Sequence, residues 1–346
     1  MPHRHRPLLL PTFGFLAMLC LLLFPETVSD AALDAMTLAA CRLIPLLFPY
    51  SVLASLMLRR RWLPTRGPLT ALYCLSGDCE GVLLSGIAAG FPVGAQGSLR
   101  LYRSGRITRE EAGILAAASS VPSPAFLAGA VGIMWGDVRF GWFLWIAANL
   151  TMALFSRLCR LRIPDRRTSS PRTAASPASS FSRDFSRSVT EAASSCLSVT
   201  GFIVFFRILA AVGSRIFPPA GPVLTLFLEF SSGVRYGAAA GGIPGAVMTG
   251  AAAGFGGISV LMQIAAQNDD GSPGDGFSLR PYLLSRLLLC AVLGVCAGVW
   301  AVIFSPTAAS PVLAEQPVSP SVILSVPGIL LLLARRDSRQ EFTGST

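Results

Sequence analysis

A carboxylate inside an apolar stretch is the first residue of this chain that could do chemistry. Glu229 lies in the run from Pro222 to Phe230, which carries no other charge. An acidic side chain at membrane depth is costly and marks a functional site by default. We expect Glu229 to contact a substrate or carry a coupling proton. The alternatives are a structural ion pair with Arg207 or Arg235, or a place at the membrane interface.

Arg207 is a second charged residue in an apolar run, between Phe202 and Ala211. A guanidinium matches a carboxylate with two parallel hydrogen bonds, so Arg207 is a candidate to attract a dianionic solute. The alternative is that its side chain extends along the helix to the nearer interface and keeps its charge in water.

The absent residue types exclude most catalytic chemistry. All 28 basic residues are arginine, so the lysine of a Walker phosphate loop and of Schiff-base chemistry is missing. The two histidines, His3 and His5, lie in the N-terminal tail. The body of the chain therefore cannot build a serine–histidine–aspartate triad or a histidine-containing metal site. We expect no enzyme activity, no cofactor and no metal.

The elements that position the charged residues are membrane helices. The 346 residues have a mean hydropathy of +0.61 and are only 13% charged, about half the charged share of a soluble domain. A spanning helix needs about 20 mostly apolar residues, which leaves room for roughly seven spans. The arginines cluster near the ends of apolar runs, which indicates topology rather than nucleic-acid binding. We expect an all-α, multi-pass protein of the cell membrane.

Hydropathy and arginine content divide the chain into five regions. Residues 1–30 are a first transmembrane helix, with a signal peptide as the alternative. Residues 31–158 and 189–305 are two halves, joined by a cytoplasmic linker at 159–188 that is rich in arginine, serine and proline. Residues 306–346 form a C-terminal helix and tail. The predicted continuous spans are residues 8–25, 33–58, 112–135, 140–158, 189–212, 282–304 and 322–333.

Two further segments, residues 69–99 and 217–266, are apolar but interrupted by glycines and prolines. Arginines flank the first on both sides, which predicts a re-entrant hairpin that enters and leaves by one face. Residues 85–96 and 249–260 align without gaps and are identical at five of twelve positions. Two broken segments on opposite faces are typical of an inverted-repeat transporter. We therefore expect two inverted halves, each with a broken helical hairpin.

The broken segments also predict where a ligand binds. Phe91-Pro92 ends one helical half and begins another, which leaves unpaired backbone groups at the tip. N-terminal helix ends favour anions. For the polar residues nearby, hydrogen bonding within and between helices is the alternative. The candidate pathway residues are Gly90, Phe91, Pro92, Gln96, Ser120, Ser123, Arg207, Glu229, Gly254, Phe255, Ser259 and Gln263.

Motifs in both halves resemble a known family. In the first half they are Ser85-Gly-Ile-Ala-Ala-Gly-Phe-Pro-Val-Gly-Ala-Gln96, Gly105-Arg-Ile-Thr-Arg-Glu-Glu-Ala112 and Ser119-Ser-Val-Pro-Ser-Pro-Ala-Phe126. In the second they are Leu228-Glu-Phe-Ser-Ser-Gly233 and Gly254-Phe-Gly-Gly-Ile-Ser-Val-Leu-Met-Gln263. Together they are similar to the sporulation integral membrane protein family YlbJ, over about residues 33–305. The chain departs from the family at Val121 and Pro122, where asparagines are usual.

That family belongs to the wider nucleoside-recognition, or Gate-domain, group. The resemblance implies a membrane transporter of a small anionic solute during spore formation, above all dipicolinic acid, in the outer forespore membrane of a spore-forming bacterium. The alternatives are a nucleoside permease and a membrane scaffold or subunit that transports nothing itself. The expected partners are the solute and the lipid bilayer, with a second copy of the chain or other sporulation membrane proteins beside them.

Overall fold

The computed structural model describes residues 9–60, 62–162, 180–268 and 276–304, and every regular element in these ranges is a helix. Four helices are long and apolar enough to cross a membrane: Val138–Arg160, Phe181–Ile216, Gly242–Asn268 and Leu279–Phe304. A fifth candidate is the bent pair Gly14–Leu23 and Pro25–Cys41. These findings confirm the all-helical class and are compatible with a multi-pass membrane protein. The inverted relation of the two halves stays a prediction.

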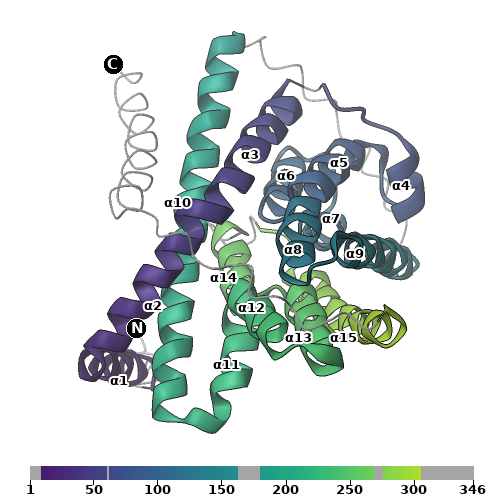
Figure 1. Ribbon diagram of the computed structural model, residues 1–346. Helices are drawn as coiled ribbons and strands as arrows, with labels where there is room; N and C mark the ends of the chain where they lie inside the picture. The colour runs from purple at the N-terminus through teal and green to yellow at the C-terminus, as the bar shows by residue number, and fades with distance from the viewer. Residues whose placement is uncertain (1–8, 61, 163–179, 269–275, 305–346) are drawn as a thin grey trace, which may run out of the picture.

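Two long helical stretches cross and form the frame of the molecule (Figure 1). One is α10 (Phe181–Ile216), whose 36 residues extend about 54 Å. The other runs through α2 (Pro25–Leu38), a π-helical turn at Ala39–Leu43 and α3 (Ile44–Arg59), and α10 packs against both of its halves. The π turn ends at Leu43, two residues before Pro45, which has no N–H for the usual helical bond. The helix therefore accommodates this proline with a wider turn.

The remaining helices of the first half lie on one side of this frame (Figure 1). They include the two halves of the first predicted broken segment, which separate at Gly90–Pro92, and α6 packs in turn against α7. These helices are α4 (Pro68–Tyr73), α5 (Glu80–Ala89), α6 (Val93–Arg103), α7 (Arg109–Ser119), the π-helical η3 (Ala125–Val131), α8 (Gly132–Met134) and α9 (Val138–Arg160).

The second half contains more interruptions than a single hairpin. Helices end and restart at Glu229, at Gly241 and at Gly256. The helix α13 lies at the centre of this half, between α12 and α15. The helices are α11 (Gly221–Leu228), α12 (Phe230–Ala240), α13 (Gly242–Phe255), α14 (Gly257–Asn268) and α15 (Leu279–Phe304).

Three predicted boundaries are wrong. The span at 112–135 is not continuous, because α7 ends at Ser119 and helix resumes at Ala125; the two prolines between them cannot donate helical hydrogen bonds. The span at 8–25 ends earlier, since α1 (Leu9–Leu23) turns by 95° into α2 at Pro25. The linker at 159–188 is shorter, because α10 begins at Phe181. The predicted span at 322–333 lies outside the described residues.

One continuous core of buried apolar residues joins the two halves. It extends from Ala35 on α2 and Leu115 on α7 to Val260 on α14 and Leu293 on α15. Within a bilayer, van der Waals packing of these side chains, rather than removal of apolar surface from water, holds the helices together. Because the core is shared, the interrupted helices of both halves are held against each other near the middle of α10.

Candidate functional site

Four helix interruptions meet in two close pairs. A Cβ atom on Gly90 would lie 2.9 Å from the Ser123 nitrogen, so the α5–α6 break lies against the α7–η3 break. A Cβ atom on Gly257 would lie 2.8 Å from the Phe230 nitrogen, so the α13–α14 break lies against the α11–α12 break. Both glycines have a φ of +77°, which other L-residues rarely adopt. Only glycine therefore permits these approaches.

A small cavity lies where the breaks meet. Its free volume is about 30 Å³, room for one or two water molecules. Four of its lining residues are phenylalanines, and the ring of Phe230 meets those of Phe91 at 5.2 Å and Phe126 at 4.8 Å between centroids. The fourth is Phe202 of α10. Such a lining favours a flat apolar or aromatic group.

Two polar side chains in the cavity wall lack hydrogen-bond partners. Ser259 and Gln263 are 1% and 2% exposed, and within the described ranges the Ser259 Oγ and the Gln263 Nε2 bond to nothing. The two residues are four apart on α14, so they share one face. An unpaired buried polar group costs about 1–3 kcal/mol. A ligand in the cavity would recover this cost by bonding to both.

Three helices begin at the cavity. Phe91 lies two residues before α6, Phe230 is the first residue of α12, and Ser259 is in the first turn of α14. Helix N-termini carry a partial positive charge of about half a unit. No charged side chain lines the cavity in the described part of the chain. The start of α12 is already capped by the Glu229 carboxylate. The field that favours an anionic or electron-rich group therefore comes from the starts of α6 and α14.

Glu229 lies beside the cavity, but its side chain bonds to the helix that it begins. It is fully buried and caps α12. Its carboxylate accepts four hydrogen bonds, from the backbone N–H of Ser231 at 2.9 Å, the backbone N–H of Ser232 at 2.8 Å and both serine hydroxyls at 2.7 Å. These nearly fill its capacity as an acceptor. The alternative of an ion pair with Arg207 or Arg235 is wrong. Glu229 positions the start of α12, and with it Phe230.

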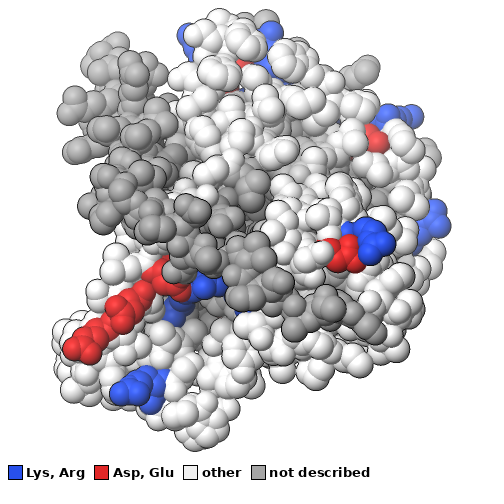
Figure 2. Space-filling model, in the orientation of Figure 1, with Lys and Arg blue, Asp and Glu red and all other residues white. Residues whose placement is uncertain are grey.

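Arg207 lies away from the cavity lining, in an ion cluster with Asp34 of α2 and Arg235 of α12. Arg207 pairs with Asp34, and Arg235 lies 3.4 Å from the same carboxylate. Figure 2 shows acidic side chains in a stripe over α2, with basic side chains beside them on a mostly uncharged surface. Arg207 thus pairs with a carboxylate within the protein, and the cluster ties α2, α10 and α12 together.

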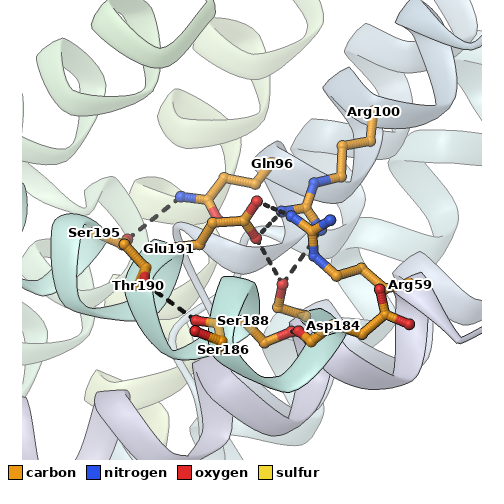
Figure 3. Close-up of polar contacts among 10 residues, drawn as sticks. Arg59, Gln96, Arg100, Asp184, Ser186, Ser188, Thr190, Glu191 and Ser195 are labelled. Atoms are coloured by element: carbon orange, nitrogen blue, oxygen red, sulfur yellow. Dashed lines mark hydrogen bonds and ion pairs between the residues drawn. The ribbon is translucent and has the colours of Figure 1, made fainter. Parts of the chain in front are cut away.

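Gln96 belongs to a second ion cluster, centred on Glu191 of α10 (Figure 3). Arg59 of α3 and Arg100 of α6 both pair with this carboxylate. The Ser55 hydroxyl donates to it at 2.8 Å. One turn before Arg100, the Gln96 side chain donates to Ser195 of α10 at 3.3 Å. This second cluster ties α3, α6 and α10 together.

The two clusters are built alike. Each has one carboxylate on one long stretch, an arginine on the other long stretch, and an arginine on a short helix that begins at the cavity. In the first cluster the carboxylate, Asp34, lies on α2, and in the second cluster the carboxylate, Glu191, lies on α10. Along α10, cavity residues Val199 and Ile203 lie between Glu191 and Arg207. The cavity thus lies between the two clusters.

The other predicted pathway residues shape the surroundings of the cavity. Ser123 lines it, and its Oγ accepts from the Phe126 N–H at 3.2 Å. Pro92 lies directly before α6. Gly254 packs against the backbone of α15 at Cys290, and Phe255 meets the ring of Phe227 at 5.2 Å. Packing is therefore the observed role of Gly254 and Phe255.

Arg286 of α15 was not recognised from the sequence as a candidate residue. It is 1% exposed, and it donates to the Ser120 carbonyl at 2.8 Å and the Ala117 carbonyl at 3.1 Å, at the C-terminal end of α7. Its guanidinium lies 4.8 Å from the centroid of the Tyr282 ring. The Ser120 Oγ has no partner among the described residues. The signal in the sequence was a lone arginine well inside an apolar run.

Comparisons with known proteins identify no family for this chain. No family model, no curated protein and no solved structure matches the chain significantly. The fold alone defines the class, an all-helical protein with four or five candidate membrane spans. The site adds a cavity built from interrupted helices.

Proposed function

We propose that this protein carries a small aromatic anion across the membrane, with its substrate site at the cavity between the interrupted helices. One observation supports this most: Ser259 and Gln263 are buried in the cavity wall without partners. Buried polar groups in native proteins are nearly always hydrogen-bonded. A site whose polar groups are left unpaired is suited to a ligand that comes and goes.

The chemistry of the lining suggests the class of solute. Four phenylalanine rings suit a flat ring, the hydroxyl and amide suit its polar substituents, and the starts of α6 and α14 favour negative charge. Dipicolinate, a pyridine dicarboxylate, has all three properties. It is also the solute implied by the sequence resemblance, and spore formation enters the proposal on that resemblance alone.

The size of the cavity implies a closed state. A free volume of about 30 Å³ is far below that of a pyridine dicarboxylate, so the site must widen to accept it. The clusters around Glu191 and Asp34 lie on either side of the cavity along α10. In the proposal, one cluster separates at a time, which opens the site to one side of the membrane.

Flux into proteoliposomes tests the proposal. We expect saturable uptake of labelled dipicolinate that uridine does not inhibit. Gln263→Leu should abolish uptake while the protein stays folded, since the lost amide has no internal partner. Gln267→Leu is the matched control: it makes the same change one turn further along α14, outside the cavity lining, and should leave uptake unchanged.

Other results would contradict the proposal. Uptake of uridine in place of dipicolinate would assign the cavity to a nucleoside permease. No uptake of either solute above empty vesicles, from protein with a cooperative thermal transition, would favour a scaffold. An equal loss of uptake in both glutamine variants would show that transport does not depend on the cavity.

A further inference from the structure

A second recess lies at the arginine-rich end of the frame, between α3, α5 and α6. Its free volume is about 290 Å³, roughly ten times that of the central cavity. Three arginines line it, Arg59, Arg100 and Arg106, together with one carboxylate, Asp78. We call it the arginine cleft. Unlike the central cavity, it has room for a small organic anion.

The charges in the arginine cleft do not cancel. Arg106 pairs with Asp78, and the other two arginines share the single carboxylate of Glu191. Three positive charges thus face two negative ones. The Arg59 Nε is buried without a partner in the described part of the chain. The side chains of Arg100 and Arg106 are 38% and 31% exposed, so a solute can reach them from water.

The arginine cleft and the central cavity lie along the same two helices. On α3, Leu47 lines the cavity and Leu58 lines the cleft; on α6, Gly97 lines the cleft just beyond Phe91 of the cavity. Between the two spaces lies a small buried cluster of Ala54, Ala89 and Val93. Val93 and Gly97 are one helical turn apart, about 6 Å. These three apolar side chains pack α3 against α5 and the start of α6 beside the central cavity, which Ala89 also lines.

We infer that the arginine cleft is an outer binding site for a small carboxylate or phosphate anion, from which the anion passes between α3 and α6 to the central cavity. The inference rests on the proposed function, since it supplies the entrance to that site. Passage requires α6 to move away from α3. An anion in the cleft competes with Glu191 for Arg59 and Arg100, which loosens α10 from both helices.

A lipid headgroup carries the same chemistry as a free anion, and we commit to the free solute. The three arginines are the groups that a small anion needs, and apolar residues such as Leu63 and Val82 line the rest of the wall. The test therefore includes membranes with and without anionic lipid, which separate the two sources.

Two variants of one ion pair provide the test, because they change the charge of the cleft in opposite directions. We would measure binding of labelled sulfate to the full chain in phosphatidylcholine nanodiscs at low salt. Asp78→Asn should tighten binding about two- to fivefold and Arg106→Gln should weaken it by a similar factor, as expected for one partly exposed charge. If Asp78 and Arg106 are only a structural bridge, both variants weaken binding alike, which overturns the inference.

Asp137 and Arg139 provide the matched control, an exposed ion pair at the start of α9, outside the arginine cleft. Asp137→Asn and Arg139→Gln make the same charge changes and should leave sulfate binding unchanged. An equal response to them would reduce the effect to net charge and overturn the inference. Loss of wild-type sulfate binding when phosphatidylglycerol is added would assign the cleft to a lipid headgroup and overturn it as well.

The same variants distinguish this inference from the proposed function. Opposite shifts in sulfate binding, with no dipicolinate uptake by the wild type, support the cleft as an anion site and count against transport. The opposite result is dipicolinate uptake with the same KM in Asp78→Asn and Arg106→Gln, together with unchanged sulfate binding. It would support transport and contradict the arginine cleft as a binding site.

Discussion

Replacement of Glu229 by glutamine separates a structural role from a chemical one. In the structure, one carboxylate oxygen accepts three hydrogen bonds and the other accepts one, all from Ser231 and Ser232. Glutamine keeps one acceptor oxygen and places an NH₂ group where the other oxygen was. If the amide oxygen keeps the three bonds, the NH₂ group faces the Ser231 N–H, which is left buried and unpaired.

The magnitude follows from two losses. An unpaired buried donor costs about 1–3 kcal/mol, and loss of a negative charge at a helix N-terminus costs about 0.3–1 kcal/mol. We expect Glu229→Gln to lower the free energy of unfolding by about 1–4 kcal/mol. Glu229→Asp should lose less, because aspartate is a favourable N-cap and keeps the charge. Glu26→Gln, at an exposed position on α2, should change little.

The assay pairs thermal unfolding of the purified variants with solute uptake per folded molecule. A capping role predicts that Glu229→Gln unfolds at lower temperature and that Glu229→Asp recovers most of the loss. Glu229→Gln with unchanged unfolding and no uptake would refute this reasoning. That result would restore Glu229 as a group that binds the solute or carries a proton.

Three further predictions concern residues outside the cavity. Glu191→Gln should lower the free energy of unfolding by about 1 kcal/mol at low salt, a modest effect because the side chain is 34% exposed; thermal unfolding should show a smaller difference at high salt. Arg286→Lys keeps the charge but loses the fork that reaches two carbonyls, so unfolding should become easier by about 1–3 kcal/mol, and an unchanged transition would contradict the capping of α7. Burial raises the pKa of Cys79, outside the candidate spans, to about 12; its thiol therefore stays protonated at pH 7–9, and mass spectrometry should find maleimide on exposed Cys74 and not on Cys79.

The positions of the helix breaks were the most predictable part of the fold. Glycines and prolines act locally, so Gly90, Pro92 and the glycine run near Gly256 predicted interruptions without knowledge of the rest of the chain. The same rule applied to Pro122 and Pro124, but the apolar character of their surroundings led to a continuous span. The prediction from hydropathy was therefore wrong where the prolines had indicated the break correctly.

The partners of charged residues were not predictable in this way. Arg207 and Glu229 were both recognised as costly in an apolar run, yet the first pairs with Asp34, far along the chain, and the second bonds to its own helix. Glu191 attracted no attention, because it lies near the predicted linker. Which side chains meet depends on how α10 crosses the other long stretch, and no local pattern carries that information.

The length of α10 gives the molecule a lever. Glu191 and Arg207 are sixteen residues apart, about 24 Å along the helix axis, and Val199, which faces the cavity, is midway between them. A rigid rod that tilts about its midpoint moves its two ends in opposite directions. A tilt of α10 about the cavity therefore displaces Glu191 and Arg207 together and in opposite directions, and the fulcrum lies where the solute would bind.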